Sequence, residues 1–108
     1  MIRELKEKRN LEILQELADV VCEETHIPLQ FLKGPSVRRE YSYTRFMFYW
    51  IATVHYGVPT PATAEFLNKT VASVRGGLRK VKPWVENKTL NPKWNKTFDK
   101  ILYKLCIK

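Results

Sequence analysis

The sequence contains no apolar run long enough to cross a membrane, and its first residues lack the apolar core of a signal peptide. Cysteine is scarce: Cys22 and Cys106 are the only two, and they form no Cys-x-x-Cys pair and no cluster with other metal ligands. There is no low-complexity segment and no internal repeat. These absences predict a cytoplasmic protein without a metal or a cofactor, in which both thiols are reduced and pack as small apolar side chains.

Groups able to carry out catalysis are equally few. The only histidines, His26 and His55, have no paired carboxylate or nucleophile in a recognisable arrangement. The glycine-rich phosphate-binding loop of ATPases is absent as well. We therefore expect that the protein is not an enzyme.

The chain does have enough apolar and aromatic material for one folded domain. Its 108 residues are 44% hydrophobic and 12% aromatic, which favours a globule over a disordered chain. Positive charge is concentrated in the middle, because residues 33–82 hold nine basic and two acidic side chains, whereas residues 1–32 hold four and seven. Phosphate neutralisation is the commonest use of such asymmetry, so we expect a nucleic-acid partner and association with the nucleoid. A basic surface that serves only solubility is the alternative.

Apolar residues recur at helical spacing along the chain, and the few β-like stretches do not alternate. The pattern predicts an all-α fold, a single compact domain over residues 1–108 with about five or six helices. Helices are expected over residues 3–24, after Pro28, over residues 42–56, from Thr60 to Phe66, over residues 70–82 and from Trp94 to Leu105. Gly57 is expected to end the central helix, Thr60 to cap the next one, and Pro83 to end or kink the helix after it.

Residues 60–82 carry the most informative pattern, a short helix, a polar turn and a second helix. Apolar residues at 3–4–3 spacing line one face of the second helix, namely Val71, Val74, Leu78 and Val81. Its other faces combine small and basic side chains: Ala72, Ser73, Arg75, Gly76, Arg79, Lys80 and Lys82. A helix with an apolar back, a basic flank and little bulk near its N-terminus fits a DNA major groove. A basic loop is expected over about residues 33–42.

The order of these elements resembles the C-terminal DNA-binding domain of the bacterial replication initiator DnaA, a member of the Trp-repressor-like helix-turn-helix group. The resemblance covers roughly residues 12–105. It rests on the long first helix, the sequence His26-Ile-Pro-Leu-Gln-Phe-Leu-Lys, the basic loop, the arginine of Thr44-Arg45-Phe-Met, and a helix-turn-helix that ends Leu78-Arg79-Lys80-Val81. The resemblance implies a recognition helix, residues 70–82, in the major groove and loop arginines in the minor groove. Because this chain lacks the ATPase part of an initiator, a protein partner is expected to supply an ATPase or regulatory function.

The start of the recognition helix departs from the family. The family signature aligns with Lys69-Thr70-Val71-Ala72-Ser73-Val74, in which Val71 and Ala72 replace a histidine and a hydroxyl residue. The resemblance therefore implies the same orientation on the duplex but a different target sequence. The initial methionine and the charged first helix favour a free-standing relative over a cut-out domain.

Each residue expected to contact DNA has a structural alternative. Arg38 and Arg39 are assigned to the minor groove, whose negative potential is enhanced where it is narrow. The alternative is that both arginines are simply solvated. Arg45 is assigned to a phosphate contact, because a cation at the N-terminus of a helix is unfavourable unless an anion lies nearby. The alternative is that Arg45 stacks on Tyr41 or Tyr43. The recognition helix supplies the rest: Lys69, Thr70 and Ser73 at its N-terminus, with plain capping as the alternative, and Ala72, Arg75, Gly76, Arg79 and Lys80 along it.

Two further features bear on these assignments. Adjacent glycines inside a helix, Gly76 and Gly77, cost about 1 kcal/mol each relative to alanine, so a neighbouring helix or the DNA backbone is expected to approach them closely. The three tryptophans are assigned to the core rather than to base stacking. The sequence thus predicts a sequence-selective double-stranded DNA-binding protein that serves replication initiation or transcriptional control. The alternative is a basic protein-interaction adaptor without sequence-specific DNA binding.

Overall fold

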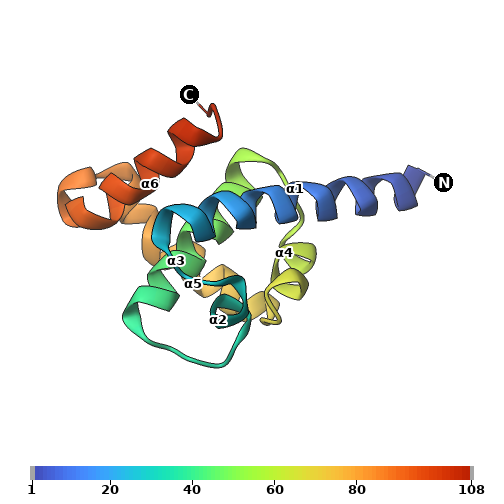
Figure 1. Ribbon diagram of the computed structural model, residues 1–108, viewed down its shortest axis with the longest axis horizontal. Helices are drawn as coiled ribbons and strands as arrows, with labels where there is room; N and C mark the ends of the chain where they lie inside the picture. The colour runs from blue at the N-terminus through green and yellow to red at the C-terminus, as the bar shows by residue number, and fades with distance from the viewer. Residues whose placement is uncertain (1, 108) are drawn as a thin grey trace.

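The computed structural model describes residues 2–107, with side chains described from residue 7 onward. These residues contain six α-helices and no strand, so the predicted all-α fold is confirmed. The elements are α1 (Ile2–Thr25), α2 (Leu29–Lys33), α3 (Arg39–Trp50), the π-helical turn η1 (Ile51–His55), α4 (Thr60–Phe66), α5 (Val71–Glu86), the 3₁₀ turn η2 (Lys88–Leu90) and α6 (Pro92–Lys104). In Figure 1, α1 lies across the other helices, and α6 packs beside its C-terminal half.

One core is shared by all the long helices. It includes Leu14, Leu17, Ala18 and Val21 from α1, Phe48 and Ile51 from α3 and η1, Val74 and Val81 from α5, and Trp94, Phe98 and Ile101 from α6. The predicted apolar stripe of α1 is therefore buried from residue 14 onward. Leu11 is an exception at 48% exposure, and the side chain of Leu5 lies outside the described residues.

The basic loop is shorter than predicted. The backbone N–H groups of Tyr41 and Ser42 both donate to the Arg38 carbonyl, at 3.0 and 2.9 Å, so α3 already begins at Arg39. The loop therefore covers residues 34–38 rather than 33–42, and Arg39 belongs to the first turn of a helix. The central helix also ends differently, because its α-helical part stops at Trp50 and continues as a π-helical turn.

The ends of the middle helices follow the prediction in part. Gly57 ends the central helix with a φ of +67°, as predicted, since glycine adopts this left-handed conformation without strain. Thr60 is the first residue of α4 rather than its cap, which is Pro59. Cys22 is partly buried, but Cys106 is exposed in a left-handed turn after α6, so the prediction of two packed thiols holds for only one.

Pro83 does not end α5, which continues to Glu86. The proline lies on the exposed side of the helix, where water can reach the carbonyl that its missing N–H leaves unpaired. Trp84 holds the turn beyond it through edge-to-face contacts with Tyr43 and Trp94, at ring-centroid distances of 5.0 and 5.5 Å. Aromatic packing thus outweighs the lost hydrogen bond, and the tryptophans lie in or against the core as predicted.

Candidate nucleic-acid interface

The outer face of α5 carries small and basic side chains from Ala72 to Lys82, and its last turn adds the exposed Pro83 and Glu86. Its exposed residues include Ala72, Ser73, Arg75, Gly76, Arg79 and Lys80. The opposite face is buried through Val74, Gly77 and Val81. These six predicted contact residues therefore lie together on the solvent-exposed side of α5.

The N-terminus of α5 is capped by its own first polar residues. The Thr70 hydroxyl oxygen accepts a hydrogen bond from the Ser73 backbone N–H at 3.1 Å, and the same hydroxyl donates to the Ser73 side chain at 3.0 Å. The capping alternative for Thr70 is thus observed. Both residues remain exposed, and the other N–H groups of the first turn keep the positive end of the helix dipole at this surface. The cap and an anion contact are therefore compatible.

The two glycines of α5 have different surroundings. A Cβ atom on Gly77 would lie 2.7 Å from Cδ1 of Phe46 and 3.0 Å from Cδ2 of Tyr49, so Gly77 is required by the close approach of α3. A Cβ atom on Gly76 would meet nothing within 4 Å. The neighbouring-helix explanation therefore accounts for Gly77 only. Gly76 lies on the exposed face, where the helix has the least bulk for an incoming ligand.

Arg45 is buried, contrary to its assignment as a phosphate contact. Its side chain is 5% exposed, and its guanidinium donates to four backbone carbonyls: Leu32 at 2.8 Å, Ser36 at 2.6 Å, Phe31 at 2.9 Å and Gly34 at 3.0 Å. Burial lowers the pKa of Arg45. Because α3 begins at Arg39, Arg45 lies in the interior of the helix, and the macrodipole argument for a phosphate does not apply.

Lys69 contacts the same turn of backbone as Arg45. Its ammonium donates to the carbonyls of Lys33 and Gly34, so it too differs from the predicted free phosphate contact. Burial, and then the charge of Arg45, lower the pKa of Lys69. The carbonyls at the end of a helix have no partners within it, and two cations satisfy those of α2 here. Lys69 immediately precedes Thr70, so this contact ties the loop to the start of α5.

Arg38 of the loop and Arg39 of α3 remain at the surface. The Arg38 side chain is 71% exposed and lies 3.9 Å from the Glu40 carboxylate, and Arg39 is exposed on the first turn of α3. An exposed ion pair at this distance contributes little, so both guanidiniums are available to an anionic partner. The loop also carries an exposed apolar residue that the sequence patterns did not single out, Val37. The one sequence signal for Val37 is its position between the turn residues 34–36 and the arginine pair.

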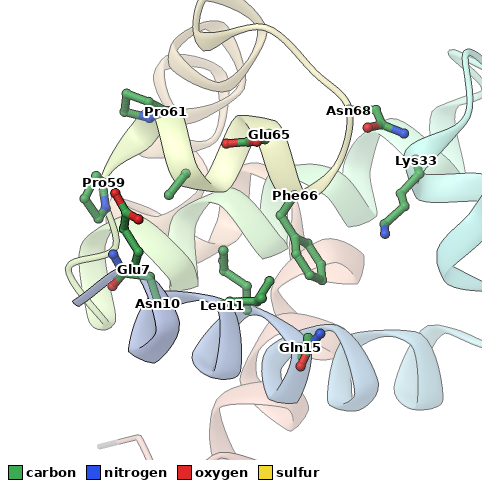
Figure 2. Close-up of a pocket in the computed structure, with 12 residues that line it drawn as sticks. Glu7, Asn10, Leu11, Gln15, Lys33, Pro59, Pro61, Glu65, Phe66 and Asn68 are labelled. Atoms are coloured by element: carbon green, nitrogen blue, oxygen red, sulfur yellow. The ribbon is translucent and has the colours of Figure 1, made fainter. Parts of the chain in front are cut away.

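A groove of roughly 800 Å³ lies between α1 and α4, and its lining reaches Lys33 and Asn68, which flank the loop and the start of α5. Figure 2 shows Leu11 of α1 and Phe66 of α4 facing each other across it, with Glu65 on the α4 side. Lys33 closes one end, its ammonium 4.9 Å from the centre of the Phe66 ring. Apolar residues and polar or charged residues contribute equally to the lining of this groove.

The described residues offer neither a cluster of metal ligands nor a membrane-spanning helix. No group of three or more histidine, cysteine, aspartate or glutamate side chains among them is placed to hold a metal ion. None of the described helices is both long and apolar enough to cross a bilayer. Comparisons with protein-family models, curated proteins and solved structures gave no match to this chain.

Proposed function

We propose that this protein binds double-stranded DNA, with α5 in the major groove and the loop of residues 34–38 over the adjacent minor groove. The observation that carries the proposal is the pair of cationic contacts to one turn of backbone. Arg45 of α3 and Lys69, just before the cap of α5, both bind the Gly34 carbonyl of the loop, and Arg45 also binds the Ser36 carbonyl. The loop and the exposed face of α5 therefore keep a fixed spacing. A fixed spacing between two basic surfaces is what reading two grooves of one duplex requires.

The sequence resemblance to the DnaA DNA-binding domain supports the same orientation, and it favours a role in replication initiation or transcriptional control. Arg38, Arg39, Arg75, Arg79 and Lys80 would contact the duplex, with Thr70, Ala72, Ser73 and Gly76 close to it. Arg45 and Lys69 act through the loop, as positioning residues. In the cell such a protein would associate with the nucleoid.

Affinity for duplex DNA is expected to fall linearly on a log–log plot against salt, with a slope that corresponds to about four to seven phosphates. Fluorescence anisotropy across a salt series measures this slope. The double variant Arg79→Gln with Lys80→Gln should reduce the slope by about two, because each cation releases about one counterion. Lys96→Gln with Lys100→Gln removes the same charge from the exposed face of α6 and should leave the slope unchanged. A slope near zero for the unmodified protein would rule out the DNA-binding proposal.

Arg75 is expected to distinguish base recognition from phosphate contact. It lies one turn into α5, within reach of a base edge, and an arginine that pairs with guanine contributes about 1–3 kcal/mol of discrimination. Arg75→Ala should therefore weaken binding to a duplex selected from random oligonucleotides by that amount, and binding to random DNA only slightly. Equal losses on the two duplexes would assign Arg75 to a phosphate.

A protein-interaction adaptor is the second candidate, and the groove between α1 and α4 favours it. Leu11 is 48% exposed there, and the carboxylate of Glu65 lies at its rim. The occupant would be an amphipathic segment, with an apolar side chain that packs on Leu11 and a positive charge that pairs with Glu65. The charge distribution favours the DNA function as the main one, because Arg75, Arg79 and Lys80 gather on one exposed face of α5. The groove is lined by two carboxylates, Glu7 and Glu65, and by one cation, Lys33.

A further inference from the structure

The tip of the loop between α2 and α3 presents an apolar side chain to solvent. Val37 is 84% exposed, more than Leu11, Phe31 or Val54. A β-branched apolar residue gains nothing from such a position in the isolated protein, because its methyl groups remain in water. In a mobile loop such exposure would carry no functional information. It points to a partner only if the loop is held in one conformation.

The backbone on both sides of Val37 is held by hydrogen bonds. The Ser36 carbonyl accepts from the Arg45 guanidinium at 2.6 Å, and the Arg38 N–H donates to the Ser36 hydroxyl at 3.4 Å. The Val37 carbonyl itself accepts from the Ser42 hydroxyl at 3.3 Å. The loop therefore fixes Val37 with its side chain outward, and a partner that receives this side chain has little loop entropy to remove.

The surroundings of Val37 define the chemistry of that partner. Arg38 and Arg39 follow it directly, both exposed, and the nearest carboxylate in sequence, Glu40, already lies 3.9 Å from Arg38. We therefore expect the partner to offer an apolar surface for Val37 with negative charge beside it. The minor groove of DNA has this composition, with phosphates along both edges and deoxyribose rings as walls. Proteins that bind in the minor groove also insert apolar side chains between base steps and bend the duplex.

We propose that Val37 is an apolar wedge that enters the minor groove at a flexible pyrimidine–purine step and bends the DNA. This inference rests on the proposed DNA-binding function and adds a deformation to it. Loop arginines alone would favour a narrow, undistorted A·T-rich groove, whereas a wedge favours steps that unstack easily, such as TA. The two contributions act on adjacent base pairs, with the arginines beside the opened step.

The test compares Val37→Ser with Val54→Ser. Both change an exposed valine, at 84% and 53% exposure, but Val54 lies in η1, outside the loop and α5, so it is the matched control. The probe is a selected duplex with end-attached fluorophores, which report bending by energy transfer, and with 2-aminopurine at the candidate step, which brightens on unstacking. The unmodified protein should bend the duplex and raise the 2-aminopurine signal. Val37→Ser should abolish both signals and lower affinity about tenfold, whereas Val54→Ser should change neither.

The outcomes separate this inference from the function on which it rests. If the protein binds the duplex tightly and Val37→Ser leaves bending, unstacking and affinity unchanged, the wedge is refuted and DNA binding stands. If the unmodified protein binds no duplex at low salt, both proposals are refuted. Loss of affinity without any bending of the duplex by the unmodified protein would also refute the wedge, because Val37 would then only line the groove. Because Val37 is so exposed, its substitution is not expected to unfold the protein.

Discussion

Replacing Arg45 with methionine is expected to lower the free energy of unfolding by about 3–5 kcal/mol. Methionine fills much of the same volume but leaves the backbone carbonyls of Phe31, Leu32 and Ser36 without this donor, whereas the Gly34 carbonyl keeps its bond from Lys69. A buried acceptor without a partner costs about 1–3 kcal/mol, and water entering the loop would recover part of the total. Urea denaturation followed by tryptophan fluorescence measures the loss.

Arg39→Met is the matched control, because it removes an exposed arginine from the same helix and should change stability by less than about 0.5 kcal/mol. Arg45→Lys should fall between the two, since one ammonium cannot reach four carbonyls from the planar fork that arginine provides. If Arg45→Met costs no more than the control, the loop carbonyls are satisfied by water and the guanidinium does not organise the loop.

The adjacent glycines of α5 are expected to respond in opposite directions to the same substitution. Gly77→Ala should destabilise the fold by about 1–3 kcal/mol, because its Cβ would lie 2.7 Å from a ring atom of Phe46 and the aromatic rings there have little room to move. Gly76→Ala should stabilise it by about 0.5–1 kcal/mol, because the added methyl group meets open space and alanine favours a helix. Thermal and urea unfolding of the two single variants give the comparison.

The same pair tests the surface of α5. If the DNA backbone approaches Gly76 closely, Gly76→Ala will bind a duplex more weakly although it folds more stably. Two variants of equal stability, or a destabilised Gly76→Ala, would contradict the packing described for α5 and α3.

Local patterns were enough to predict the helices. The 3–4–3 spacing of Val71, Val74, Leu78 and Val81 gave the buried side of α5, and therefore its exposed side. Thr70 was expected to cap α5 and does so. These features depend on residues within one or two turns of each other, and helical periodicity reports such relations directly.

Contacts between distant segments were beyond these patterns. The Arg45 guanidinium binds carbonyls up to 14 residues away, and the Lys69 ammonium binds carbonyls 35 and 36 residues away. Nothing in the spacing of charged residues distinguishes such cations from those that face solvent. Pro83 is a similar case, because the aromatic contacts of Trp84 that hold the helix beyond it come from α3 and α6.

The two cations that hold the loop bind its main chain, and this has a consequence for how its specificity can change. Every residue presents a carbonyl, and the cations bind those of Gly34 and Ser36, so the path of the loop depends little on the side chains at Val37 and Arg38. Substitutions at Val37 and Arg38 can therefore accumulate, or be introduced by design, without displacing the loop from α5. A library randomised at these two positions, with Arg45 and Lys69 kept, should yield folded proteins that differ in the duplexes they prefer.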